Sequence, residues 1–283
     1  MTTFDQLSHS TIPDTMTETP HEAFAWRLRQ HGFPTALLGN VPPKSEVHRF
    51  VDGMFEVMFP HNCQQVRQTV VRYGELVEHL QQLLAPLAVD AAAVAEAFFA
   101  ALPNLFDQLL EDANAVLASD PAATGLAEVI VAYPGFYTVA VYRLAHQLLA
   151  LGAPLLPRML TEYAHGQTGI DIHPAAQIGR ALVIDHGTGT IIGATARIGD
   201  YVQLYHGVTL GALQVAKSMA NTKRHPTIED HVTIYANATI LGGETVVGHH
   251  SIIGGNVWLT ESVPPYSQVY HEGKVRVRTK PLE

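Results

Sequence analysis

The stretch IIGATARIGDYVQLYHGVTLG, residues 191–211, carries a branched apolar residue at every sixth position. These positions are Ile192, Ile198, Leu204 and Leu210. A period of six fits neither an amphipathic α-helix, whose apolar residues recur every three to four positions, nor a strand that alternates at every second residue. It is typical of a β-helix, in which short strands form each coil and each six-residue unit directs one side chain inward.

The same spacing continues on both sides of this stretch. The further positions are Ile172, Ile178 and Ile184 upstream, and Ile228, Ile234, Ile240, Val247, Ile253 and Leu259 downstream. About thirteen units are countable, which predicts roughly four coils. The insertion LQVAKSMANTK, residues 213–223, interrupts the spacing and must loop out. We therefore expect a parallel β-helix over residues 169–265, followed by a C-terminal tail at residues 266–283.

One step of the spacing is irregular. Ile184 and Ile192 lie eight positions apart instead of six, and Asp185 and His186 stand side by side at the start of this step. The two extra residues predict a bulge in the coil. Functional sites are where a sequence departs from its own structural rule, so we expect the site here. The regular apolar positions fill a core and carry no chemistry.

The residues before the β-helix have a different period. Between residues 21 and 168 apolar side chains recur at helical spacing, as in QQVRQTVVRYGELVEHLQQLL (64–84) and GFYTVAVYRLAHQLLALG (135–152). Pro103 suits a helix start, and Asp120-Pro121 separates two helices. The polar residues 1–20 have no periodicity and are expected to form a flexible tail. The predicted fold class is therefore α+β, with an N-terminal α-helical domain preceding the β-helix.

Composition excludes several classes of protein. A net charge of −9 argues against nucleic acid as a partner, because phosphate binding needs a basic surface. No segment approaches the ~18 uninterrupted apolar residues of a membrane span. No Lys or Arg precedes Arg27, so a targeting peptide is not expected. Cys63 is the only cysteine and is expected to be an inert core residue. The cytoplasm is the expected location.

A histidine at the irregular step suggests acid–base chemistry. The neutral imidazole of His186 could accept a proton from a hydroxyl at cellular pH, although the same residue could simply cap a turn. A carboxylate on the other ring nitrogen would orient such a base. The side chain of Asp185, its neighbour, is expected to point away. Asp171 precedes His186 by slightly less than one coil of about 18 residues, so it is expected nearly beneath the imidazole.

Other polar residues could bind a small substrate. Arg224, where the chain re-enters the coil after the insertion, offers a fork of donors that suits a carboxylate, although a solvated arginine at a loop end is common. His225 could be a second donor or a loop residue, and Asp120 is a further candidate.

Two other kinds of site are not expected. Gly187 and Gly189 resemble the start of a dinucleotide-binding motif, but no helix follows them. The histidines offer no clear zinc ligand set, because His225 and His231 are six apart and further histidines are adjacent or isolated. We therefore expect no metal.

Four motifs together resemble the serine O-acetyltransferases of the hexapeptide-repeat family. They are DIHPAAQIGRALVIDHGTG, GVTLGA, RHPTIEDHVTIYANATILGG and SVPP, and the resemblance runs from about Asp120-Pro121 to Pro265. It implies a left-handed β-helix in homotrimers, whose N-terminal helical domains often join two trimers into a hexamer. It also implies an acyltransferase that moves the acetyl group of acetyl-CoA to the hydroxyl of L-serine, giving O-acetyl-L-serine for cysteine biosynthesis.

The resemblance also implies roles for residues near the irregular step. His186 falls on the general base of the family, and Asp171 falls on the carboxylate that pairs with it. Asp120 and Asp185 fall on the acids that hold the substrate ammonium, with Asp120 reaching the site from a neighbouring subunit.

The remaining site residues follow by the same comparison of motifs. Arg224 falls on the residue that binds the serine carboxylate, with His225 beside it. The small residues that line the acetyl-CoA groove are matched by Gly211, Ala212 and Ala236. The expected mechanism is direct attack of the serine hydroxyl on the thioester in a ternary complex, with a His-Asp general base.

Three alternatives are compatible with a β-helix. Another hexapeptide-repeat acyltransferase would use a different hydroxyl or amine acceptor, but Asp120, Asp185 and Arg224 together favour serine. A metal-dependent lyase and a non-catalytic trimeric scaffold are the others. The chain ends at Glu283, whereas many family members carry a longer tail with a bulky apolar end that docks into the sulfhydrylase of the next step. A stable complex of that kind is therefore not expected.

Overall fold

The computed structural model describes residues 19–30, 41–60, 63–213 and 222–273. Residues 1–18 of the predicted N-terminal tail, most of the insertion and the end of the C-terminal tail lie outside these residues. The chain divides into two compact units, Met1–Val41 and Pro42–Glu283. In the first unit the structure describes one helix, α1 (Pro20–Gln30).

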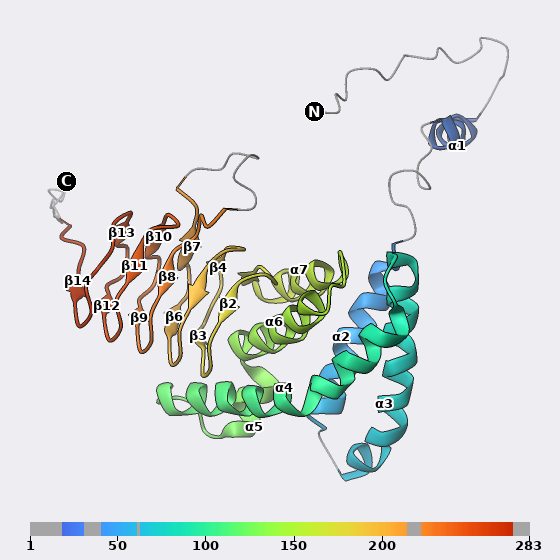
Figure 1. Cartoon of the computed structure of the whole chain (residues 1–283), viewed down its shortest axis with the longest axis horizontal. Helices are drawn as coiled ribbons and strands as arrows, with labels where there is room; N and C mark the ends of the chain where they lie inside the picture. The colour runs from blue at the N-terminus through green and yellow to red at the C-terminus, as the bar shows by residue number, and fades with distance from the viewer. Residues whose placement is uncertain (1–18, 31–40, 61–62, 214–221, 274–283) are drawn as a thin grey trace, which may run out of the picture. The chain divides into compact units, whose positions relative to one another are not determined.

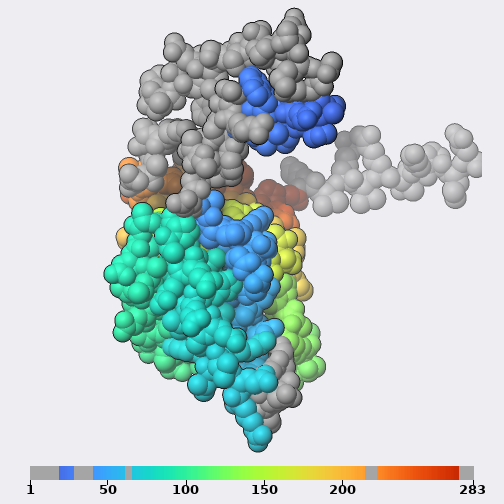
Figure 2. All heavy atoms as spheres, turned by 90° about the vertical axis from the view of Figure 1, so that its right-hand side faces the viewer, coloured from blue at the N-terminus to red at the C-terminus, as the bar shows by residue number. Residues whose placement is uncertain are grey.

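The second unit begins with helices whose apolar faces share one core. They are α2 (Lys44–Met58), α3 (Cys63–Leu84), the short 3₁₀ helix η1 (Ala85–Leu87), α4 (Ala91–Ser119), α5 (Leu126–Ala132), α6 (Pro134–Ala150) and α7 (Leu156–Thr168). Figure 2 shows α2 and α3 side by side in blue and cyan. Aromatic side chains such as Phe50, Phe98 and Phe136 are buried where the helices meet. None of the helices that the structure describes combines the length and the hydropathy that a membrane crossing requires.

The prediction of a helix start at Pro103 is wrong, because Pro103 lies inside the single long helix α4. A proline inside a helix leaves one backbone carbonyl without its donor. This carbonyl belongs to Phe99, and it accepts a hydrogen bond from the hydroxyl of Tyr73 at 3.1 Å. Leu102 and Leu105 on either side are buried in the helical core, which favours continuing the helix. The predicted break at Asp120 is confirmed, since α4 ends at Ser119.

The chain then forms a parallel β-solenoid with three sheets, drawn in yellow to red in Figure 1. Sheet A contains β1 (Asp171–Ile172), β4 (Ile191–Ile192), β7 (Thr209–Gly211), β10 (Thr239–Leu241) and β13 (Trp258–Leu259). Sheet B contains β2 (Gln177–Ile178), β5 (Arg197–Ile198), β8 (Thr227–Ile228) and β11 (Val246–Val247). Sheet C contains β3 (Val183–Asp185), β6 (Gln203–Tyr205), β9 (Thr233–Ile234), β12 (Ile252–Ile253) and β14 (Gln268–Val269).

Consecutive strands lie in different sheets, so each coil has three strands and three corners. We call them the AB, BC and CA corners, which in the first coil are residues 173–176, 179–182 and 186–190. The predicted inward positions stack in register, for example Ile192 with Leu210 and Ile240 with Leu210. These side chains form a continuous buried core. The repeat pattern therefore predicted the fold.

The solenoid is longer than the sequence indicated. Sheets of five, four and five strands correspond to about five turns instead of roughly four. The difference lies at the C-terminal end, where Val263 bridges to Val247 and β14 pairs with β12 beyond residue 265. Neither Val263 nor Val269 keeps the six-residue spacing from Leu259, so the count from the sequence missed this turn.

A buried ion pair joins the helices to the first coil. Arg143 of α6 donates from Nε to Asp112 Oδ2 at 2.5 Å and from Nη2 to Asp112 Oδ1 at 2.8 Å. Both residues also bond the BC corner. Arg143 Nη2 donates to the carbonyl oxygen of Gly179 at 2.8 Å, and the amide of Leu182 donates to Asp112 Oδ1 at 3.0 Å. The pair therefore holds α4 and α6 against the strand that carries Asp185.

Candidate active site

The predicted bulge is present in the CA corner of the first coil. Ile184 pairs with Leu204 and Ile192 pairs with Leu210, so eight residues there oppose six in the next coil. His186, Gly187 and Gly189 accommodate the extra length with φ angles of 56°, 78° and 80°, in the left-handed region. A Cβ atom on Gly187 would lie 2.3 Å from Ile170 Cδ1, so this position also needs glycine for space.

The bulge exposes the imidazole of His186 and brings it back toward Asp185. His186 Nδ1 lies 3.7 Å from Asp185 Oδ1, and the His186 side chain is 73% exposed. The expectation that Asp185 points away is therefore wrong, because the left-handed backbone at His186 reverses the usual alternation of neighbouring side chains. A second imidazole, that of His206, stands 5.9 Å from His186 between ring centroids.

Asp120, which caps the C-terminus of α4, lies within the electrostatic reach of this corner. The pKa of Asp120 is lowered, first by the hydroxyl of Tyr133 and then by the amide of Ala122, with a smaller contribution from the charge of His186. The charge of His186 of the same chain therefore acts on Asp120. The expectation that Asp120 reaches the site of a neighbouring subunit stays a prediction. We call Asp120, Asp185 and His186 the acid–imidazole cluster.

Asp171 is not beneath His186 in this chain, which corrects the expectation from spacing. Asp171 pairs with Ile191 in sheet A, twenty residues along, because the bulge lengthens the first coil. Its carboxylate accepts a hydrogen bond from Arg158 Nη1 of α7 at 2.9 Å through Oδ1. Asp171 therefore lies opposite Ile191 and not opposite His186.

Asp171 belongs to a second group of charged residues near the AB corner. Burial lowers the pKa of His173, and the charges of Arg158 and Arg224 lower it further, while Asp171 opposes them. Arg224 and His225 stand at the same corner two coils on, where the chain enters β8. We call Asp171, Arg158, His173, Arg224 and His225 the AB-corner cluster.

His225 is a buried, neutral hydrogen-bond donor. The amide of Thr195 donates to His225 Nδ1 at 3.1 Å, and Thr195 Oγ1 lies 2.8 Å from the same atom, so the ring proton belongs on Nε2. Burial, followed by the charges of Arg224 and Lys223, lowers the pKa of His225 to about 4. Gly193 makes room for the ring, since a Cβ there would lie 2.1 Å from Nε2.

His225 should make the protein less stable as the pH falls from 7 to 5. Its pKa drops from 6.5 to about 4 on folding, so in this interval the unfolded chain binds a proton that the native chain does not. The stabilisation is complete above pH 6.5 and is lost as the pH approaches 4. Wild-type protein should lose roughly 1–2 kcal/mol more than His225→Asn between pH 7 and pH 5. Urea unfolding at both pH values measures this, with His231→Asn, at an exposed histidine, as control. Equal losses in all three proteins would contradict it.

The three small residues matched to an acetyl-CoA groove lie at two places. Gly211 ends β7 and Ala212 follows it, near the AB corner, whereas Ala236 follows β9 in the CA corner. The carbonyl of Ala236 accepts from the amide of Asn256 in the next coil. A Cβ on Gly211 would lie 2.8 Å from Leu241 Cδ2, so packing against the next coil also accounts for this glycine.

Among the described residues, Glu162, His165 and Asp171 form a group that could hold a metal ion. Arg158 lies at 2.5 Å from Glu162 Oε1 and at 2.9 Å from Asp171 Oδ1, so a guanidinium already neutralises both carboxylates. The geometry therefore favours an ion-pair network at this place.

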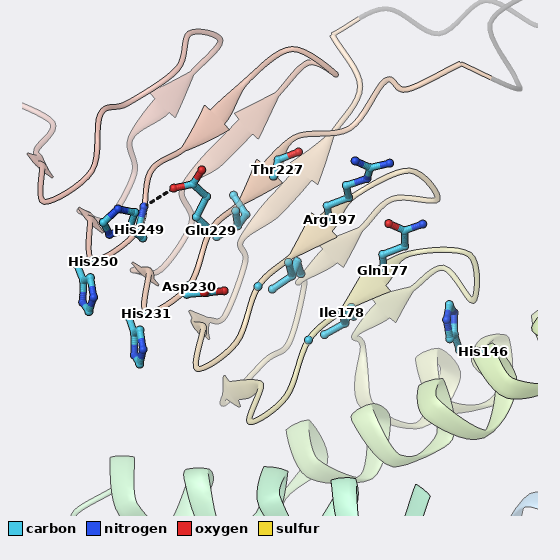
Figure 3. Close-up of a pocket in the computed structure, with 14 residues that line it drawn as sticks. His146, Gln177, Ile178, Arg197, Thr227, Glu229, Asp230, His231, His249 and His250 are labelled. Carbon is cyan, nitrogen blue, oxygen red and sulfur yellow. Dashed lines mark hydrogen bonds between the residues drawn. The ribbon is translucent and has the colours of Figure 1, made fainter. Parts of the chain in front are cut away.

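A hollow of about 910 Å³ on sheet B contains none of the candidate site residues (Figure 3). His231 and His250 stack there with ring centroids 4.7 Å apart and planes 4° from parallel. Tyr201 and Tyr266 extend the column on either side, and His249 meets it edge-on. Parallel rings direct their nitrogen lone pairs along separate planes, so this column does not present His231 and His250 to one metal ion.

Sequence reasoning missed three residues that hold the site residues in place. Arg158 bonds Asp171, Thr195 bonds His225, and Tyr133 bonds Asp120. Arg158 and Tyr133 lie in helical sequence and Thr195 in a repeat unit, where nothing in the period marks them as polar partners. The packing of α6 against β3 and of α7 against β1 brings Tyr133, which precedes α6, and Arg158 of α7 to the site.

No family model matches the chain. Among curated proteins, it is 49% identical over 185 residues to the plasmid serine acetyltransferase of Synechococcus elongatus, covering 64% of this chain and 58% of that protein. It is 50% identical over 119 residues to the serine acetyltransferase of Mycobacterium tuberculosis, covering 42% of this chain and 50% of that protein. The chain thus spans about half the length of the curated relatives it matches.

Solved structures match over more of the chain. The native serine acetyltransferase 1 from Entamoeba histolytica has a TM-score of 0.73 and 32% identity, covering 81% of this chain and 98% of that chain. Serine acetyltransferase isoform 3 from the same organism, in complex with cysteine, has a TM-score of 0.72 and 33% identity, covering 82% and 84%. Both the helices and the solenoid are included at this coverage.

Proposed function

The chain belongs to the serine acetyltransferase family, and from this premise we propose that it transfers the acetyl group of acetyl-CoA to the hydroxyl group of L-serine. The match to solved family members over four fifths of the chain supports the proposal. The site residues, the mechanism and the assembly are parts of the same proposal.

The observation that carries the proposal is the chemical match between L-serine and the two clusters. The acceptor presents an ammonium group, a carboxylate and a hydroxyl. Asp120 and Asp185 would hold the ammonium, Arg224 would hold the carboxylate, and His186 would accept the hydroxyl proton. An acceptor without the amino acid backbone would leave some of these charged groups without a partner, which disfavours it.

The two clusters lie at different corners of one chain, so we propose that they meet between copies in a homotrimer. Asp171 of one copy would then face His186 of the next, with Oδ1 on Arg158 and Oδ2 left for the imidazole. A carboxylate in that place fixes the tautomer of the base and stabilises the imidazolium. Whether two trimers pair into a hexamer depends on the helical region.

The proposed mechanism is direct attack within a ternary complex. His186 removes the hydroxyl proton as the serine oxygen attacks the thioester carbonyl carbon. The tetrahedral intermediate expels the thiolate of CoA, which takes the proton from the imidazolium, so charge and protons balance. Neutral His225 would donate from Nε2 to a substrate oxygen. Gly211, Ala212 and Ala236 would admit acetyl-CoA close to the backbone, and no step requires a metal.

The test follows thiol release from acetyl-CoA with L-serine and with a panel of other acceptors. We expect L-serine to give the highest kcat/KM and initial-rate lines that intersect, as a ternary complex requires. If an amine or a sugar reacted faster than L-serine, the protein would instead be a hexapeptide-repeat acyltransferase with a different acceptor. Parallel lines would indicate an acetylated enzyme and contradict direct attack.

A further inference from the structure

The carboxylate of Asp120 is fixed by two donors, one on each oxygen. Tyr133 donates from its hydroxyl to Oδ2 at 2.6 Å, and the amide of Ala122 donates to Oδ1 at 2.8 Å. We propose that Tyr133 is a positioning residue, which holds Asp120 in the orientation that receives the ammonium group of the acceptor. The inference rests on the proposed function and adds a residue to it that no motif indicated.

Tyr133 is itself held in place by the helices. It follows α5 and immediately precedes α6, and its hydroxyl contacts Asp120, the residue after the last one of α4. Its amide donates to the carbonyl of Val129, and its carbonyl accepts from the amide of Tyr137. The ring is half-buried against the helical core. The hydroxyl therefore reaches Asp120 from a rigid support.

The hydrogen bond between Tyr133 and Asp120 keeps the phenol protonated and the carboxylate ionised. The hydrogen bond from Tyr133 is the main cause that lowers the pKa of Asp120, so Asp120 remains an anion. The same bond raises the pKa of Tyr133 to about 12, so the phenol remains protonated. The charge of Asp185 makes a smaller contribution to this rise.

A fixed Asp120 matters because it follows the last residue of α4, in a short segment before α5. Two carboxylates bind one ammonium well only if their separation is set before the ligand arrives. With the Ala122 amide alone, the carboxylate could rotate about that single bond. Tyr133 does not touch the reacting atoms, so its loss should weaken acceptor binding and leave the chemical step nearly unchanged.

Tyr133→Phe removes the hydroxyl and keeps the ring. We expect KM for L-serine to rise roughly three- to tenfold, because the Asp120 carboxylate must then be ordered as the ammonium group binds. Neither kcat nor KM for acetyl-CoA should change more than about twofold. Tyr163→Phe is the matched control, because Tyr163 donates to both oxygens of Asp52 at 3.1 Å in another tyrosine–aspartate pair. It should retain the wild-type KM.

A double-mutant cycle separates positioning from a general structural effect. If Tyr133 acts through Asp120, Tyr133→Phe should have almost no further effect on KM in an Asp120→Asn background. Additive effects of the two substitutions would overturn the inference. A fall in kcat with an unchanged KM would also overturn it.

A second readout does not depend on the acceptor. The pKa of Asp120, from the ¹³C shift of its carboxyl carbon, should rise in Tyr133→Phe and stay constant in Tyr163→Phe. If wild-type protein preferred another acceptor, the proposed serine transfer would be wrong. The positioning role of Tyr133 would then be tested by comparing the KM for that acceptor between wild type and Tyr133→Phe. If no acceptor in the panel reacted, an unchanged pKa of Asp120 would overturn the inference and a raised one would support it.

Discussion

Alanine in place of His186 should lower the kcat of acetyl transfer by about 10²- to 10⁴-fold, the usual contribution of a positioned general base. A serine hydroxyl is a weak nucleophile until its proton is removed, so loss of the proposed base should slow the chemical step itself. KM for L-serine should change much less, because Asp120, Asp185 and Arg224 would still bind the substrate. Steady-state kinetics with saturating acetyl-CoA measures both constants.

His231→Ala is the matched control for this variant. His186 and His231 are both exposed corner residues of the solenoid, with φ angles of 56° and 58°, so alanine imposes a similar backbone cost at each. His231 lies at the BC corner, beside the hollow of Figure 3. We expect wild-type turnover from it. Near-normal turnover in His186→Ala would refute the role of the base.

The second large effect should come from Asp112→Ala, which should cost about 3–5 kcal/mol of unfolding free energy. The Asp112 and Arg143 side chains are 1% and 5% exposed, so the substitution leaves a buried guanidinium without its carboxylate. It also removes the acceptor for the amide of Leu182. Urea denaturation at pH 7 measures the loss. The exposed pair Arg49–Glu46 gives the control, since Arg49→Ala should cost less than about 1 kcal/mol.

The buried pair has a further testable property. Burial is the main influence on Asp112 and raises its pKa in spite of Arg143, so ionisation at this place carries a desolvation cost. Replacing both partners with apolar residues of similar size, Asp112→Leu with Arg143→Met, should therefore retain more stability than Asp112→Ala alone. A loss within about 1 kcal/mol of wild type for Asp112→Ala would show that water reaches the guanidinium.

The solenoid was predictable because the constraint that forms it is local and repeats. Each inward Ile, Val or Leu must stack on the residue one coil earlier, so the spacing of six appears directly in the sequence. The irregular step between Ile184 and Ile192 was visible for the same reason, and its bulge is present. Pro103 misled the prediction, because its neighbours Leu102 and Leu105 are buried in the helical core and the Tyr73 hydroxyl supplies the donor that the proline lacks.

Side-chain partners within the candidate site were less predictable, since they depend on coil length and backbone conformation. The partner of Asp171 shifted because the bulge made the first coil twenty residues long. Asp185 lies near His186 because a non-glycine residue adopts a left-handed φ, which no pattern marks. Tyr133 reaches Asp120 through the packing of α4, α5 and α6, and a linear period carries no information about such a contact.

The longer CA corner shows that the number of residues in a corner does not affect how the strands pair within the sheets. Strand pairing before and after the bulge is undisturbed, and β7 and β8 likewise keep their places in sheets A and B on either side of the insertion. Residues can thus be added between strands without altering which inward side chains stack. The stacked interior of the coil stays the same when a corner lengthens. Substrate preference in such a protein can therefore change through the corner segments alone.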